Sequence, residues 1–154
     1  MNAPFLPESE LEAPILRREG EGKTVSILGG RCTLKVRSDE TDGAYAILEQ
    51  QVPPSHGPPL HVHRHETEIF YVLEGTFEIQ VGEQKHEVQR GAMFAGPRNI
   101  PHKFRNIGSE TGKLLLTIVP GNFANYFLEA DGVDHSNPTI DQQLSEKYGI
   151  ESLE

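Results

Sequence analysis

The sequence has little cysteine, no tryptophan and no long apolar run. Its single cysteine, Cys32, has no partner in the chain, so an intrachain disulfide framework is excluded. Cys32 lies in the alternating run RCTLKV, and we expect it to be a small buried or half-buried side chain rather than a reactive thiol.

Basic residues are also scarce, with 14 against 23 acidic residues and a formal net charge of -9. They are scattered along the chain, and a surface of this sign repels phosphate backbones and anionic lipids. We therefore expect no nucleic-acid partner and no membrane-surface partner.

The N-terminal stretch MNAPFLPESELEAP places Pro and Glu where a signal peptide needs a basic region followed by an apolar run. Moreover, no segment reaches the roughly 18 apolar residues of a membrane span. The 154 residues fit one domain that can bury a core without disulfides. The expectation is a soluble, cytoplasmic, single-domain protein.

Between Lys23 and Pro120, short β-rich runs alternate with turn residues about every ten residues, which predicts an all-β sandwich or barrel. Gly75 and Gly82 lie between such runs and suit tight hairpins. We therefore expect residues 68–73, 76–81 and 84–89 to be consecutive antiparallel strands.

After Pro120 the spacing of apolar residues becomes helical. The run NFANYFLEA predicts an amphipathic helix with Asn122 as its N-cap, and TIDQQLSEKYG predicts a second helix that ends at Gly149. The chain then divides into three parts: an N-terminal arm (1–22), a β-barrel (23–120) and a C-terminal helical tail (121–154).

The stretch GPPLHVHRHETEIFYVLEG carries the chemistry. In an extended chain, side chains alternate between faces, so His61 and His63 point the same way. The same alternation places Glu68 on an apolar face with Phe70 and Val72. A carboxylate there is costly unless it is paired or coordinated, and two imidazoles beside it make a ligand set for a transition metal.

The later run GAMFAGPRNIPHKFRN supplies a fourth candidate ligand, His102. The turn from Pro97 to Pro101 fixes the chain just before it, and His102 shares a strand face with Phe104 and Asn106.

Together these residues resemble the cupin superfamily. Its first motif is HxH, four residues, Glu, six residues, Gly. Its second is Gly, five residues, Pro, one residue, Gly, two residues, His, three residues, Asn. The inner Gly of the second motif is Asn99 here, which also tolerates a left-handed conformation. Eight motif positions match in register: His61, His63, Glu68, Gly75, Gly91, Pro97, His102 and Asn106.

The resemblance implies a double-stranded β-helix, or jelly roll, whose His61, His63, Glu68 and His102 bind one divalent metal ion: Fe, Ni, Mn, Co, Zn or Cu. The alternative is a degenerate cupin whose histidines only form hydrogen bonds inside the barrel. It would be favoured if one of the four ligands were replaced, and none is.

Within the superfamily, EIFYVLEG and the tail sequence EKYGI resemble single-domain bacterial cupins that are similar to flavonol (quercetin) dioxygenases. This likeness implies a ring-cleaving dioxygenase acting on a small phenolic or enolic substrate, with Glu68 as both ligand and general base. The expected pocket walls are apolar and aromatic: Leu60, Phe70, Val72, Ile79, Phe94 and Phe104. A non-enzymatic metal cupin for sensing or storage is the alternative. A homodimer is also expected, from the resemblance and from the apolar tail helices.

Sugar-phosphate isomerase cupins are disfavoured because no inward basic cluster is predicted; strand parity turns Lys103 and Arg105 outward. His65 and Glu66, in the loop before Glu68, are expected to be solvated, although Glu66 is close enough in sequence to compete with Glu68. Three further histidines are expected at the surface: His56, His86 and His135.

Overall fold

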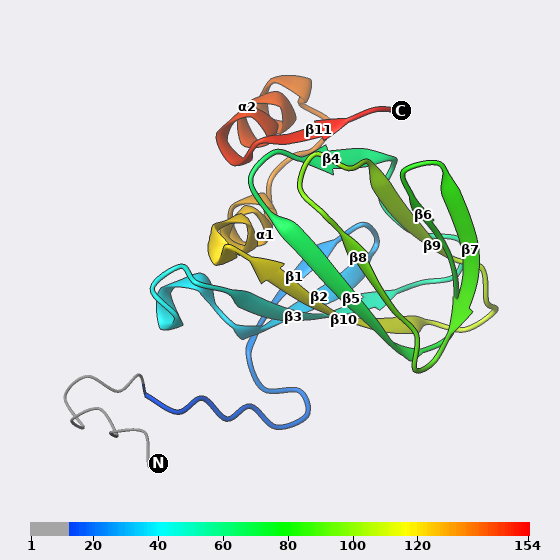
Figure 1. The fold of residues 1–154 in the computed structure, drawn as a ribbon. Coiled ribbons are helices and arrows are strands. Elements are labelled where there is room, and N and C mark those ends of the chain that lie inside the picture. The colour runs from blue at the N-terminus through cyan, green and yellow to red at the C-terminus, as the bar shows by residue number, and fades with distance from the viewer. Residues whose placement is uncertain (1–12) are drawn as a thin grey trace, which may run out of the picture.

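The computed structural model describes residues 13–154, which form two facing antiparallel sheets with short helices at one end (Figure 1). The larger sheet has the strand order β1-β2-β3-β10-β5-β8. Its strands are β1 Lys23–Ile27, β2 Gly30–Val36, β3 Ala46–Val52, β5 Thr67–Glu74, β8 Met93–Gly96 and β10 Gly112–Val119. The prediction of an all-β barrel with short C-terminal helices is confirmed.

The smaller sheet has the order β11-β4-β9-β6-β7. Its strands are β4 His61–His63, β6 Thr76–Val81, β7 Gln84–Gln89, β9 His102–Asn106 and β11 Ile150–Ser152. The core lies between the two sheets, because strand alternation turns one face of each inward. In the central strand β10, for example, Leu114, Leu116 and Ile118 are buried, while the residues between them are only partly buried.

The two predicted hairpins have different outcomes. Gly82 joins β6 and β7 in a hairpin whose last pair is Val81 with Gln84, as predicted. At Gly75 the prediction is wrong: β5 pairs with β10 and β8, whereas β6 pairs with β7 and β9 in the other sheet. Gly75 has a φ of 95°, and a Cβ there would lie 3.0 Å from the Cα of Gly112. The glycine therefore forms a corner between sheets rather than a hairpin.

The first tail helix begins later than predicted. A 3-10 turn, η3 (Gly121–Phe123), precedes α1 (Ala124–Ala130), and Asn122 does not cap it. Its side-chain oxygen instead accepts a hydrogen bond of 3.1 Å from Ser38, in the 3-10 turn η2 (Ser38–Glu40). Asn122 thus ties the tail to the loop that precedes β3.

The second tail helix, α2 (Pro138–Tyr148), ends at Gly149 as predicted, with a φ of 65° at that residue. Its N-cap is Asn137, whose side chain accepts a hydrogen bond of 3.1 Å from the backbone N–H of Thr139. Pro138 occupies the first helical turn, where its missing N–H costs nothing.

The tail is not purely helical, which corrects the predicted description of residues 121–154. After Gly149 the chain forms β11, which pairs with β4 at the edge of the smaller sheet. Figure 1 shows β11 beside β4; in this ladder Ile150 lies opposite His63, and Ser152 lies opposite His61. The end of the chain therefore supports the strand that carries two predicted metal ligands.

At the other end of the chain, residues 1–12 of the predicted arm lie outside the described residues, and residues 13–22 form no helix or strand. Cys32 is buried as predicted, and burial raises the pKa of its thiol to about 12. No helix between residues 13 and 154 combines the length and apolar character needed to cross a membrane.

Candidate metal centre

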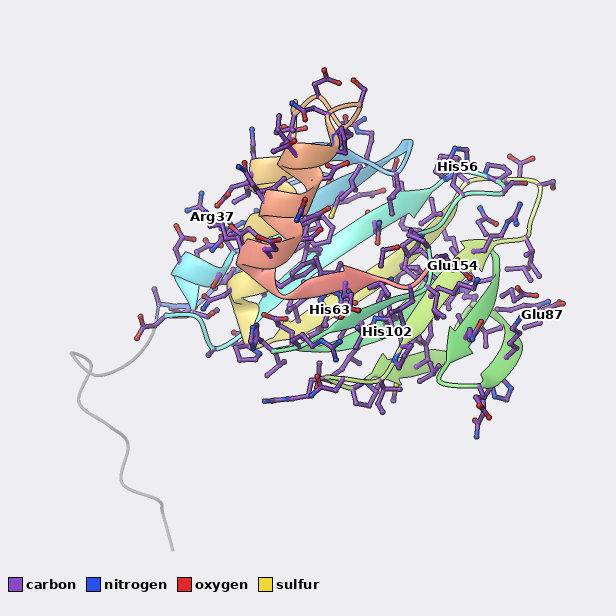
Figure 2. The ribbon with its side chains drawn as sticks, turned by 90° about the horizontal axis from the view of Figure 1, so that it is seen from above. Arg37, His56, His63, Glu87, His102 and Glu154 are labelled. Atoms are coloured by element: carbon purple, nitrogen blue, oxygen red, sulfur yellow. The ribbon has the colours of Figure 1, made fainter. Side chains whose placement is uncertain are left out.

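The four predicted ligands come from three strands on both sheets. His61 and His63 lie on β4 of the smaller sheet, and His102 lies opposite His61 on β9. Glu68 comes from β5 of the larger sheet, where the alternation of buried and exposed residues turns it inward. The rings of His63 and His102, both labelled in Figure 2, have centroids 5.6 Å apart.

The donor atoms of His61, His63, Glu68 and His102 lie within 4.8 Å of one another, and all four residues are buried. Glu68 Oε2 is 2.9 Å from His102 Nε2 and 3.2 Å from His63 Nε2. A single carboxylate oxygen therefore faces two imidazole nitrogens at the centre of the cluster.

The outer nitrogens of two histidines fix the direction in which the rings point. His61 Nδ1 lies 2.8 Å from the carbonyl oxygen of Pro59, and His102 Nδ1 lies 3.0 Å from that of Ile100. Because a carbonyl can only accept, both Nδ1 atoms are donors. When these rings are neutral, each Nε2 is left with a lone pair for a metal.

Gly96 makes room for one of these rings. It pairs with Glu68 in the β5–β8 ladder, and a Cβ at this position would lie 2.5 Å from His102 Nδ1. Any side chain at residue 96 would therefore displace the His102 ring. The sequence motifs did not single out Gly96, because its role depends on a neighbour from another strand.

Burial and pairing with neighbouring groups shift the pKa values of the cluster in opposite directions. Burial alone would raise the pKa of Glu68, but the nearby His63 and the hydrogen bonds from His102 and His63 lower it far below its usual range. For His102, burial acts to lower the pKa, but the hydrogen bond and charge of Glu68 outweigh it and raise the value. Burial lowers the pKa of His61 to about 4 despite the attraction of Glu68.

These residues fit a divalent metal ion. Three imidazoles and one carboxylate, with their donor atoms turned to one point, form a ligand set typical of first-row transition metals. His61 is neutral near pH 7, as coordination requires, and Glu68 is ionised. The four residues therefore form a possible metal-binding site.

A cavity of about 660 Å³ opens onto this cluster. Two of the predicted wall residues, Phe70 and Phe104, line it together with His61, His63 and Glu68. The other four predicted wall residues are absent from the lining. Val72, Ile79 and Phe94 are instead packed in the core between the sheets, and Leu60 is half-buried beside the cluster.

The tail supplies a wall that the sequence did not predict. Its residues in the cavity lining are Phe123, Tyr126, Phe127, His135, Asp141, Ser145, Ile150 and Ser152. The ring of Phe123 contacts that of His63 edge-on, with centroids 4.3 Å apart. The helical spacing of Phe123, Tyr126 and Phe127 was visible in the sequence, but not the surface against which they pack.

The remaining histidines are exposed as predicted, namely His56, His65, His86 and His135. His135 nevertheless lies at the cavity, with Nδ1 2.6 Å from Asp141 Oδ1 and Nε2 3.1 Å from the carbonyl oxygen of Ala130. The prediction that Glu66 is solvated is wrong: the residue is 4% exposed, and its Oε2 lies 3.8 Å from His63 Nδ1.

Comparison with known proteins agrees with this geometry. The family model described as "Cupin domain" matches residues 48–119, which contain all four candidate ligands. The quercetin 2,3-dioxygenase of Bacillus subtilis is 26% identical over 74% of this chain and 34% of its own length. An uncharacterized protein of Methanocaldococcus jannaschii is 35% identical over 49% of this chain and 60% of its own. The chain thus spans between about a third and three fifths of these relatives.

Solved structures show the same fold. A protein of Thermotoga maritima, described as a predicted oxalate decarboxylase, superposes with a TM-score of 0.62. The match covers 70% of this chain and 99% of the other, at 18% identity. At that identity the likeness establishes the architecture alone.

Proposed function

We propose that this chain, whose residues 48–119 match the cupin domain family, is a metal-dependent, ring-cleaving dioxygenase for a small phenolic or enolic compound of flavonol type. One observation carries the proposal. Four buried donor atoms converge within 4.8 Å at a cavity that is lined mostly by aromatic and aliphatic side chains. The similarity to a quercetin 2,3-dioxygenase supports the choice of substrate class.

In this proposal His61, His63, Glu68 and His102 hold one divalent metal ion. When bound, such an ion supplies a Lewis acid that lowers the pKa of a coordinated hydroxyl group. The chain would position a flat substrate with its hydroxyl toward Glu68 and its rings against Phe104 and Phe123. The apolar lining would exclude water from the reacting atoms.

Glu68 would also act as the proton acceptor. Its Oε2 lies at the centre of the cluster, where it would take the proton of a substrate hydroxyl that arrives there. Loss of this proton makes the ring electron-rich toward dioxygen. Dioxygen would add to two ring carbons while the carbon–carbon bonds that link them break. Both oxygen atoms would enter the product, so no external reductant is needed, and Glu68 would return its proton to the product.

The first experiment tests the site. We expect purified protein to contain close to one equivalent of a divalent metal by elemental analysis, and His61→Ala and His102→Ala to lose most of it. His86→Ala, in an exposed strand position, is the matched control and should keep its metal. Equal metal content in all four proteins would refute the ligand assignment.

The second experiment tests the reaction. Protein reconstituted with Fe, Mn, Co or Ni should consume oxygen when given quercetin or a simple enediol, and Glu68→Gln should abolish the uptake. If the protein binds quercetin or the enediol but takes up no oxygen with any of the metals, the enzyme proposal is refuted. That outcome would favour the non-enzymatic cupin that senses or stores a small molecule.

We also propose a homodimer, to be tested by light scattering during size-exclusion chromatography. Exposed apolar side chains of neighbouring strands β5 and β8 support it: Ile69, Tyr71 and Met93 are 37%, 44% and 63% exposed. A monomer at micromolar concentration would refute it. The cytoplasmic location and the lack of nucleic-acid and membrane partners stay predictions.

A further inference from the structure

Two buried polar atoms lack a hydrogen-bond partner among residues 13–154, and they face each other. They are His63 Nδ1 and Glu66 Oε2, at a distance of 3.8 Å. The side chains of His63 and Glu66 are 1% and 6% exposed, so water does not readily replace the missing partner. An unpaired buried polar group is costly, which makes a pair of them at one place unusual.

The Nδ1 atom of His63 differs from those of the other two histidines in the group that it faces. The Nδ1 atoms of His61 and His102 already donate to the carbonyl oxygens of Pro59 and Ile100. His63 has no such carbonyl, and a carboxylate stands in that position instead. Of the three imidazoles, His63 is therefore the one whose outer nitrogen faces a side-chain carboxyl group rather than a backbone carbonyl.

Two carboxylates occupy different edges of the His63 ring. Glu68 Oε2 lies 3.2 Å from Nε2, on the side of the candidate metal site. Glu66 Oε2 is on the Nδ1 side, and Glu66 is not part of the group of converging donors. Glu66 therefore does not compete with Glu68 as a ligand, although the two are close in sequence.

The surrounding structure holds this arrangement in place. The carbonyl oxygen of His63 accepts a hydrogen bond of 2.8 Å from Asn99, and the N–H of Arg64 donates one of 2.9 Å to Gly149. The edge-on contact with Phe123 limits rotation of the His63 ring. These contacts fix the chain at His63 and Arg64. In the residues that follow His63, Arg64 and His65 are exposed and Glu66 is buried.

We infer that Glu66 is the positioning residue for His63 in the proposed metal centre. When His63 binds metal through Nε2, its Nδ1–H donates to the Glu66 carboxylate. A charge-assisted bond of this kind is about 2.7–2.9 Å long, so the two groups approach by roughly 1 Å. The bond fixes the tautomer and orientation of His63 and makes it a stronger ligand than a histidine that donates to a carbonyl.

This inference rests on the proposed metal site, and metal affinity tests it directly. Dissociation constants for Co²⁺ would be measured by competition with a chromophoric chelator. We expect Glu66→Ala to bind Co²⁺ about 10- to 100-fold more weakly than the wild type. Glu66→Gln, whose amide oxygen accepts the same bond without charge, should lie between them.

Glu87→Gln is the matched control, because it removes the same charge from an exposed position on β7 (Figure 2). It should bind Co²⁺ as the wild type does. Glu66→Gln is nearly isosteric with the native residue and keeps the test valid if Glu66→Ala unfolds. Circular dichroism of the metal-free proteins would verify that the fold is retained.

A second measurement separates positioning from a general structural effect. In Co²⁺-loaded protein, the Nδ1–H protons of the three ligand histidines should give three hyperfine-shifted, exchangeable NMR signals. Glu66→Gln should move one signal and speed its exchange with solvent, and leave the signals of His61 and His102 in place. Three unchanged signals and an unchanged dissociation constant would overturn the inference.

The outcomes for the two proposals are distinct. If the wild type binds no metal, the proposed function and this inference both fail. If the wild type binds Co²⁺ and Glu66→Gln and Glu66→Ala bind it equally well, the inference fails and the metal centre stands.

Discussion

In the barrel, the side chains that face the cavity alternate along strands. In the tail (residues 121–154), the side chains that face the cavity lie mainly on helices, and the last of them lie on the strand β11. The barrel contributes all four candidate ligands, from β4, β5 and β9. The tail contributes aromatic residues and β11, which pairs with the ligand strand β4. The candidate ligands and much of the cavity wall thus come from parts of the chain that are far apart in sequence.

The comparison shows two ways of fixing a side chain. A ligand on a strand is oriented by the hydrogen-bonded ladders on its flanks, as Glu68 is between β8 and β10. A tail residue such as Phe123 is oriented by packing on other rings, including Tyr126 at 5.1 Å and Phe127 at 5.5 Å. We therefore expect the barrel to control global stability and the tail to control the integrity of the site.

The largest expected effect compares the same substitution in both regions. Phe70→Ala should lower the free energy of unfolding by about 3–5 kcal/mol, because the ring is buried and stacks on Phe94. Phe123→Ala should mainly expose tail amides to hydrogen exchange and leave β10 protected. Equal loss of protection in β10 for both variants would erase the proposed difference between the regions.

Removal of β11 tests whether the barrel site needs the tail. Truncation after Gly149 deletes the ladder to β4, whose backbone hydrogen bonds contribute about 0.5–1.5 kcal/mol each. We expect metal binding to weaken about 10- to 100-fold, as measured by chelator competition. Glu151→Gln, which loses only an exposed ion pair with Arg64, is the control. Unchanged affinity after truncation would show that the barrel holds its ligands alone.

A smaller effect is expected at Asn99, where the sequence departs from the Gly of the family motif. Asn99 has a φ of 64° and donates its N–H to the carbonyl oxygen of His63. Asn99→Val should destabilise the protein by about 1–2 kcal/mol, because a β-branched residue resists this conformation. Asn99→Gly should be tolerated in the same thermal unfolding measurement. If Gly were as harmful as Val, backbone conformation would not be the cause.

The smallest expected effect depends on pH and lies in the tail. Both nitrogens of His135 face acceptors, and the hydrogen bond to Asp141 raises its pKa. This stabilisation is fully present below the ordinary histidine pKa and is lost as the pH rises through the raised value. His135→Gln should cost about 0.5 kcal/mol near pH 5.5 and almost nothing near pH 8.5. The effect is small because the side chains of His135 and Asp141 are 49% and 43% exposed. A cost that grows with pH would contradict this sign.

Much of the barrel could be predicted from the sequence, because its signals are local. Alternation along β5 was enough to place Glu68 and Phe70 inside and Tyr71 outside, and the turn residues around Gly82 marked a real hairpin. The same pattern could not distinguish the hairpin at Gly82 from the corner at Gly75. Both glycines have a positive φ, and only strand pairing across the molecule distinguishes the two turns.

The sequence by itself singled out the four candidate ligands: alternation in an extended chain put His61 and His63 on one face, and the resemblance to the two cupin motifs joined Glu68 and His102 to them. The tertiary structure decided the rest of the site. It buried Glu66 against His63, placed Val72, Ile79 and Phe94 in the core, and brought β11 to β4. These features depend on contacts between segments that are distant along the chain, and no local pattern of residues encodes such contacts.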